Sequence, residues 1–139
     1  MSALYGKAIG EEARYREKDV LLGPGVNIYR TPLNGRNFEY LGEDPYLASV
    51  MCVPYIQEVQ KNGVAACVKH YALNNQELWR GHIDVELSDR ALHEIYLPAF
   101  KAAIQQGGSW TIMGAYNKIR GPTRLPQRTD ARTKFYKGD

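Results

Sequence analysis

Apolar side chains recur along the chain at helical spacing and in continuous runs, and together they predict three units of a helix followed by a strand. The first helix is expected to be capped by Ser2 and to end near Asp19. Its apolar face is predicted to consist of Leu4, Ala8, Ile9 and Ala13. A short buried strand is predicted at residues 20–28, interrupted by Gly23-Pro24-Gly25.

The second unit has a clearer start, because Asp44 is a favoured N-cap and Pro45 suits the first helical position. Pro54 is expected to kink this helix, since its ring clashes with the preceding turn. The apolar face is predicted to be Leu47, Val50, Met51, Tyr55 and Val59. Residues 64–68 form an unbroken apolar run, which predicts a strand covered on both faces.

The third unit is predicted to begin at the N-cap Ser88, and Pro98 is expected to divide its helix in two. Its apolar positions are Ala91, Leu92, Ile95, Tyr96, Ala99, Phe100, Ala103 and Ile104. Residues 110–115 form the next predicted buried strand. Strands that alternate with helices predict a parallel α/β fold. The strand-to-helix loops are long (29–43 and 69–87), an asymmetry that both a barrel and a doubly wound sheet show.

Composition limits the class of protein. The chain has 139 residues, 44% of them apolar and 24% charged, which is ordinary for a globular domain but short beside the roughly 250 residues of a complete (β/α)8 barrel. No segment approaches the ~18 consecutive apolar residues of a membrane span, so no membrane partner is predicted. The two cysteines lack metal-ligand spacing and no glycine-rich loop has a nucleotide-binding pattern, so no metal or cofactor is predicted.

The positive charge is concentrated at the C-terminal end. The formal net charge of the whole chain is +3. From residue 118 onward seven basic residues face only two acidic ones, whereas residues 1–117 sum to −2. The basic residues are Lys118, Arg120, Arg124, Arg128, Arg132, Lys134 and Lys137. This tail leaves open a nucleic-acid-binding protein, although no nucleic-acid partner is predicted, because the tail lacks aromatic interleaving beyond Phe135 and Tyr136.

Three motifs follow one another along the chain. Residues 30–39 and 42–45 read R-T-P-L-N-G-R-N-F-E and G-E-D-P, residues 68–74 read V-K-H-Y-A-L-N, and residues 113–117 read M-G-A-Y-N. In this order and at this spacing they resemble the N-terminal barrel domain of glycoside hydrolase family 3, of the β-glucosidase type. The resemblance implies a partial (β/α)8 TIM-type barrel of about three βα units. It spans residues 1–121 and leaves residues 122–139 as a basic tail, expected to be disordered.

The resemblance also implies which residues bind substrate. Arg36, Lys69 and His70 match positions that bind the non-reducing glucose, and Met113 and Tyr116 match positions that line the same pocket. Fixed N–H donors are what the hydroxyls of a β-glucoside or oligosaccharide require. The implied reaction is retaining hydrolysis of an O-glycosyl bond with release of non-reducing-end glucose.

Each of these residues also has an ordinary structural interpretation. Arg36 could be a surface arginine paired with Glu39 or Glu43, and Glu39 is expected to orient Arg36. Lys69 and His70 could be a solvated strand end, and Met113 and Tyr116 could belong to the core. The combined match favours the binding role for all five.

The catalytic carboxylates are missing from the resemblance. A retaining glycosidase needs two carboxyl groups about 5–5.5 Å apart. The family's nucleophile lies in a downstream S-D-W segment and its acid/base in a later domain, and neither matches a residue here. Asp130 follows Tyr116 too closely, in a polar and basic context, to be the nucleophile. We therefore predict no catalytic residue and no activity for the chain alone; the alternative is a non-catalytic sugar-binding relic. Unpaired strand edges of an incomplete barrel also predict self-association.

Overall fold

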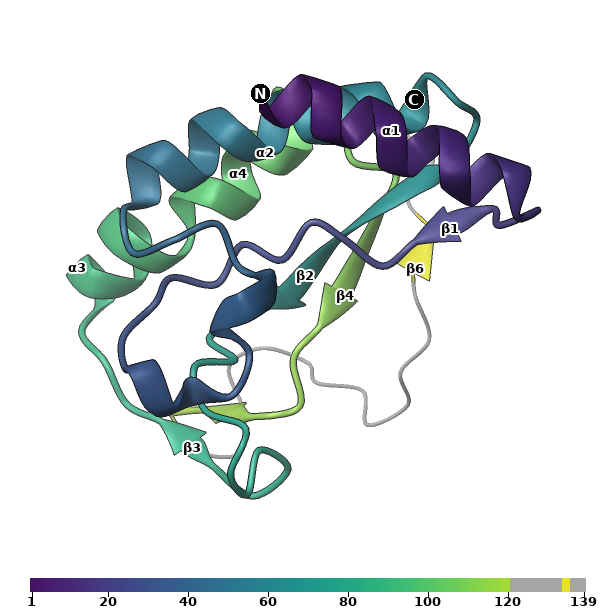
Figure 1. The fold of residues 1–139 in the computed structure, drawn as a ribbon. Helices are drawn as coiled ribbons and strands as arrows, with labels where there is room; N and C mark the ends of the chain where they lie inside the picture. Colours follow the sequence, from purple (N-terminus) through teal and green to yellow (C-terminus); the bar gives the residue numbers. More distant parts are fainter. Residues whose placement is uncertain (121–133, 136–139) are drawn as a thin grey trace.

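A computed structural model describes residues 1–120 and the backbone of residues 134–135. The fold is α/β (Figure 1). The larger elements are α1 (Ser2–Tyr15), β1 (Val20–Leu21), α2 (Pro45–Gln60), β2 (Ala65–Tyr71), α4 (Pro98–Gln105) and β4 (Thr111–Gly114). The smaller ones are η1 (Pro32–Asn34), η2 (Asn37–Glu39), β3 (Asp84–Val85), α3 (Asp89–Ala91), the π-helical turn η3 (Leu92–Tyr96), β5 (Lys118–Ile119) and β6 (Lys134–Phe135).

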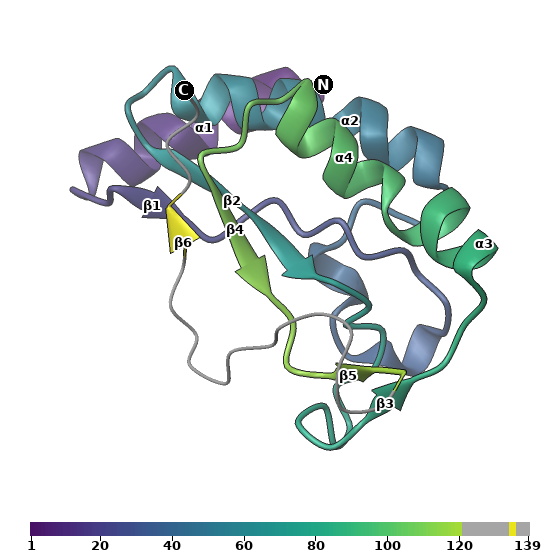
Figure 2. The same ribbon diagram turned by 180° about the vertical axis from the view of Figure 1, so that it is seen from behind.

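The main sheet has the strand order β1-β2-β4-β6. The first three strands are parallel, with Val20 opposite Ala65 and Val68 opposite Ile112. Helices α1, α2 and α4 lie along the same side of this sheet (Figures 1 and 2). The predicted helix-then-strand units and parallel pairing are therefore confirmed. Sequential strand order with helices on one side suits an arc of a barrel better than a doubly wound sheet; the incomplete (β/α)8 barrel itself stays a prediction.

One edge of the sheet differs from expectation. We expected exposed strand edges at both ends, and the end beyond β4 has an additional strand: β6 pairs antiparallel with β4, placing Phe135 opposite Thr111 and Lys134 opposite Ile112. Within the described part of the chain, the sheet therefore ends in β1 on one side and in β6 on the other. Apart from these two residues, the predicted disorder of 122–139 lies outside the described residues.

The first predicted strand is also shorter than expected. Only Val20–Leu21 forms a regular strand, and Gly25 then makes isolated parallel bridges to Tyr40 and Lys69. A second parallel pair, β3 with β5, was not predicted, because two-residue strands leave no periodic pattern. This pair joins the end of the long loop after β2 to the segment after β4.

Most predicted helix starts are confirmed. The Asp44 side chain accepts hydrogen bonds from the backbone N–H groups of Tyr46 (2.7 Å) and Leu47 (2.9 Å). Ser88 caps α3 by accepting from Ala91 N–H, and Pro98 opens α4. Ser2 was wrongly assigned as a cap: Met1 is the N-cap residue of α1, and the Ser2 hydroxyl donates instead to the Met51 carbonyl of α2 at 2.6 Å.

The buried faces of α1 and α2 are set by small residues rather than by the largest apolar ones. Gly6, Gly10 and Ala13 are buried on α1, whereas the predicted Leu4 is 72% exposed. A Cβ on Gly6 would lie 2.5 Å from the Tyr55 carbonyl oxygen, so the glycine allows the two helices to approach closely. The buried side of α2 is Ala48, Cys52, Tyr55, Ile56 and Val59, rotated away from the predicted Leu47 and Val50.

The core lies between these helices and the sheet. Phe100 of α4 is 2% exposed and meets the Tyr71 ring of β2 edge-on, with centroids 5.2 Å apart. Among the described residues, the other fully buried large side chains are seven aliphatic ones and four asparagines: Ile28, Ile56, Leu73, Val26, Val59, Val64, Val68, Asn27, Asn34, Asn74 and Asn117. None of the helices in the described residues is long and apolar enough to cross a membrane.

Candidate functional site

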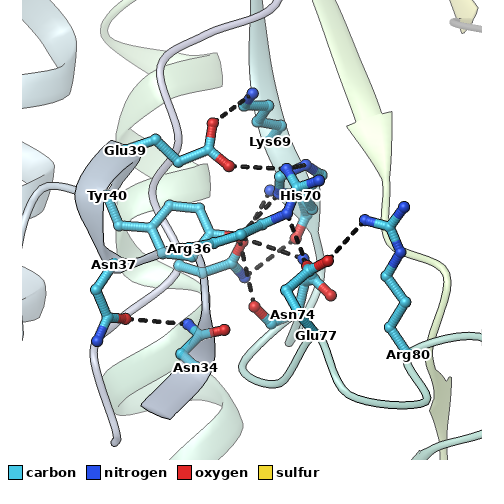
Figure 3. A network of polar contacts seen from close by, with 11 residues as sticks. Asn34, Arg36, Asn37, Glu39, Tyr40, Lys69, His70, Asn74, Glu77 and Arg80 are labelled. Atoms are coloured by element: carbon cyan, nitrogen blue, oxygen red, sulfur yellow. Dashed lines mark hydrogen bonds and ion pairs between the residues drawn. The ribbon is translucent and has the colours of Figure 1, made fainter. Parts of the chain in front are cut away.

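A cluster of polar side chains gathers at the C-terminal end of β2 (Figure 3). Two stretches of the chain contribute to it: the loop before α2, and the end of β2 together with the loop that follows it. Its members are Arg36, Glu39, Tyr40, Lys69, His70, Asn74, Glu77 and Arg80. The C-terminal ends of parallel strands are where α/β folds place their binding sites.

The loop before α2 is fixed by its own polar side chains. The Thr31 hydroxyl caps η1 by accepting from Leu33 N–H, and Gly35 follows with φ of +91°, a conformation that favours glycine. Asn37 donates from its side chain to the Thr31 carbonyl (2.8 Å) and accepts from the buried Asn34 side chain (3.1 Å). Arg36, between these contacts, is therefore held toward β2.

The end of β2 is held by an asparagine rather than by a full strand pair. Asn27 is 2% exposed; its side-chain oxygen accepts from His70 N–H (2.8 Å), and its side-chain nitrogen donates to the His70 carbonyl (3.1 Å). These two bonds satisfy backbone groups that would otherwise be buried without partners. The peptide bonds Lys69–His70 and Tyr71–Ala72 are cis.

Arg36 is bound by two carboxylates. Its Nη1 lies 2.8 Å from Glu39 Oε1, and its Nε lies 2.7 Å from Glu77 Oε1. Burial alone would lower the pKa of Arg36, but the neighbouring Glu39 and Glu77 outweigh it and raise that pKa above its usual value. The expected orientation of Arg36 by Glu39 is confirmed, and the second partner is Glu77 rather than the alternative Glu43.

Glu39 bridges the two cations that the sequence nominated. Its Oε2 lies 2.7 Å from Lys69 Nζ, while its Oε1 faces Arg36. Burial would raise the pKa of Glu39, yet its hydrogen bonds and charge interactions with Lys69 and Arg36 hold that pKa below its usual range. Glu39 is therefore an ionised anchor.

His70 lies beneath the ion pairs and is 5% exposed. Its Nε2 lies 3.1 Å from Arg36 Nη1, and its Nδ1 lies 2.9 Å from the Tyr40 hydroxyl. Because a guanidinium only donates, Nε2 accepts, and the proton of a neutral ring sits on Nδ1 and points to Tyr40. Burial lowers the pKa of His70 to about 4, and the charges of Lys69 and Arg36 act in the same direction.

The five nominated residues are not equally close to this cluster. Arg36, Lys69 and His70 belong to it directly (Figure 3). Tyr116, 52% exposed beyond β4, is connected through Arg80, whose guanidinium carbon lies 4.8 Å from the Tyr116 ring centroid. Met113 lies on the neighbouring strand β4, and within residues 1–120 no hydrogen bond or ring contact joins it to the cluster.

Several members of the cluster escaped the sequence analysis: Tyr40, Glu77, Arg80 and the supporting Asn27. A charge argument could have found Glu77. Two half-buried cations beside one another need more than one carboxylate. Within residues 1–120, no group of three or more His, Cys, Asp and Glu side chains could hold a metal ion.

Comparisons with known proteins agree on one family. The model of the glycosyl hydrolase family 3 N-terminal domain matches residues 3–132, past the boundary predicted at Gly121. β-Glucosidase BoGH3A of Bacteroides ovatus is 86% identical over 121 residues, which cover 87% of this chain and 16% of that protein. An exo-α-(1→6)-L-arabinopyranosidase of Bifidobacterium longum is 49% identical over 116 residues, 84% of this chain and 15% of that protein.

A solved structure confirms the similarity of the backbone. The β-glucosidase 3B of Thermotoga neapolitana, solved in complex with glucose, is 49% identical with a TM-score of 0.84, covering 86% of this chain and 17% of that one. The chain thus spans about one sixth of the length of the relatives it matches. On the family match and these identities, the chain belongs to glycosyl hydrolase family 3, with residues 3–132 falling in that family's N-terminal domain.

Proposed function

We propose that the cluster at the end of β2 is the sugar-recognition part of a β-glucosidase-type glycoside hydrolase, which releases glucose from the non-reducing end of a β-glucoside or oligosaccharide. Arg36, Lys69 and His70 form its base, and Met113 and Tyr116 line its side. Support comes from the named relatives and from the arrangement of N–H donors in the cluster.

The donors left over by the ion pairs carry the proposal. Arg36 has five N–H donors, and its contacts to Glu39, Glu77 and His70 use Nε and Nη1. Lys69 has three donors, and its ion pair with Glu39 uses one. Within the described residues, Nη2 of Arg36 and the rest of the Lys69 ammonium are thus available to vicinal sugar hydroxyls. Both stems are fixed, so little ordering cost is left for binding.

Glucose is the sugar we propose for this position. Two of the relatives named above are β-glucosidases, one of them solved with glucose, and another is an arabinopyranosidase. Arabinopyranose lacks the hydroxymethyl group of glucose but keeps a six-membered ring with vicinal hydroxyls. Donors such as Arg36 and Lys69 suit the shared hydroxyls, so discrimination at the hydroxymethyl group belongs to other residues.

We further propose that the chain alone binds sugar without cleaving it. The carboxylates nearest the candidate donors are Glu39 and Glu77, and both are committed to ion pairs. The lowered pKa of Glu39 makes it unsuited to donate a proton as general acid. A retaining mechanism in the whole enzyme requires two further carboxyl groups about 5–5.5 Å apart.

A titration of the chain with glucose, followed by NMR, tests the binding. Arg36→Ala is expected to weaken glucose affinity at least tenfold, because charge-assisted hydrogen bonds contribute about 1.5–3 kcal/mol. Arg90→Ala, a matched change on the exposed turn α3, should leave affinity unchanged. Equal effects of the two variants would remove the proposal. Steady hydrolysis of an aryl β-glucoside by the chain would contradict its inactivity.

Nucleic acid and a second copy of this chain are the other partners to consider. No nucleic-acid partner is predicted, and the basic tail at 122–139 that left this alternative open includes only Lys134 and Phe135 among the described residues. Self-association stays a proposal: within the described residues the sheet ends in β1 and β6, each paired on one side alone. Gel filtration at several concentrations measures the second directly.

A further inference from the structure

We propose that Glu77 and Arg80 are positioning residues, which transmit the placement of Arg36 to Tyr116 and so fix two sides of the sugar site relative to each other. This inference rests on the proposed function for its meaning in catalysis. Its geometry stands on contacts within residues 1–120 alone.

Glu77 joins the loop after β2 to the loop before α2 through one carboxylate oxygen and its backbone N–H. One carboxylate oxygen, Oε1, lies 2.7 Å from Arg36 Nε and accepts from the Asn74 side chain at 3.0 Å. The other, Oε2, lies 2.9 Å from Arg80 Nη1. The Glu77 backbone N–H donates to the Asn34 carbonyl at 3.1 Å, so the residue is tied to the loop before α2 by main chain and side chain together.

The two carboxylates of the cluster, Glu39 and Glu77, bind different sets of cations. Glu39 binds Arg36 and Lys69, both of which lie within the proposed donor set. Glu77 binds Arg36 on one side and Arg80 on the other, and Arg80 is not a nominated sugar ligand. Glu77 therefore connects the donor set to a residue outside it, Arg80, whereas both partners of Glu39 belong to the set.

Arg80 carries the connection to the segment after β4. Its guanidinium lies over the Tyr116 ring at 4.8 Å, within the range of a cation–π interaction. The Tyr116 ring is half exposed, and Arg80 is its one ring or ion contact within the described residues. A guanidinium fixed by a carboxylate loses less freedom on stacking than a free one, so Glu77 determines where Arg80 holds the ring.

Gly35 leaves room for the Glu77 side chain beside the loop that carries Arg36. A Cβ at this position would lie 3.3 Å from both Cβ and Cγ of Glu77, and the φ of +91° would strain any other residue. The glycine thus lets the Glu77 side chain pass directly beneath Arg36. The same loop therefore supplies both the sugar ligand and the space for the residue that orients it.

The test uses Glu77→Gln and Arg80→Gln in the full chain, with Glu86→Gln as matched control. Glu86 lies exposed on the same loop and makes no ion pair in the described part of the chain. Two quantities are measured: the NMR signals of the Tyr116 ring in the unliganded chain, assigned with Tyr116→Phe, and the glucose dissociation constant. Circular dichroism confirms that each variant is folded.

Both substitutions are expected to move the Tyr116 ring signals in the same direction, while Glu86→Gln leaves them in place. Glu77→Gln is expected to weaken glucose binding about tenfold, and the double variant to be no weaker than Glu77→Gln alone, because the two residues act as one unit. Unmoved Tyr116 signals in Glu77→Gln would overturn the inference. If the unaltered chain binds no glucose, the proposed function fails, and the Tyr116 signals still decide the positioning role. If Glu77→Gln does not fold, Arg80→Gln decides it by the same signals.

Discussion

The helical layer is held together by apolar packing, whereas the polar cluster is held together by ion pairs and hydrogen bonds. Between the helices and the sheet, aliphatic side chains and Phe100 pack without charge, and small residues let α1 and α2 touch. At the C-terminal end of β2, Glu39 and Glu77 are shared among Arg36, Lys69 and Arg80 in a network of ion pairs. The first region tolerates changes of identity that keep volume, whereas the second depends on each charged group keeping its partners.

The largest effect should come from emptying the core. Phe100→Ala is expected to lower the free energy of unfolding by about 3–5 kcal/mol, because it removes a fully buried ring and leaves a cavity beside Tyr71. Urea unfolding measures it. Phe38→Ala is the matched control, since that ring is 86% exposed, and it should change stability by less than about 0.5 kcal/mol. Similar losses in both variants would mean that the helical layer is not the main source of stability.

Lowering the pH should reduce the free energy of unfolding through protonation of His70. The folded state lowers the pKa of His70 from 6.5 to about 4, so the unfolded chain takes up the proton more readily. Stability from this group is complete above pH 6.5, falls as the pH drops toward 4, and levels off below that, by up to about 3 kcal/mol. Glu39, with its lowered pKa, acts with the same sign at lower pH.

Unfolding curves at several pH values measure this dependence. His70→Gln should flatten the part between pH 6.5 and 4, whereas His93→Gln, exposed on the π-helical turn, should not. An NMR titration that placed the pKa of His70 at or above 6.5 would contradict the buried neutral ring.

Removing one charge from the cluster should cost less than removing a core ring. Glu39→Gln leaves Lys69 and Arg36 short of a counter-charge, and we expect a loss of about 1–3 kcal/mol in unfolding free energy. Glu43→Gln, an exposed glutamate on the same loop, is its control. If both variants unfold alike, the ion pairs of Glu39 contribute nothing to stability.

The smallest effect is expected at an ion pair outside both regions. Arg90 and Glu94 are paired on the surface, with side chains 84% and 58% exposed. Arg90→Ala should change the unfolding free energy by less than about 0.5 kcal/mol, because solvent screens the pair. A loss as large as that of Glu39→Gln would show that burial is not what distinguishes the cluster.

The fold was predictable wherever the signal was local. The capping residues Asp44 and Ser88 and the proline Pro98 each marked a helix start. The apolar run at 64–68 predicted β2. The buried faces of α1 and α2 were less accessible, because close packing on Gly6 depends on what the partner helix presents rather than on hydrophobicity along one helix.

The candidate site was predictable in part for a related reason. Arg36, Lys69 and His70 carry a motif, and the structure brings them together. Glu77 and Arg80 act through partners 41 and 36 positions away, in Arg36 and Tyr116, and no spacing along the chain encodes such a contact.

Asn27 has a consequence for how the site can vary. Its side-chain amide has the donor and acceptor of a peptide group, so the main chain at residue 70 is satisfied whatever side chain stands there. The ligand positions can therefore change identity without releasing the end of the strand. Asn27 itself cannot be replaced in the same way. An aspartate would set an acceptor oxygen against the carbonyl of residue 70 in place of the amide donor, and a glutamine is one methylene too long for the same fit.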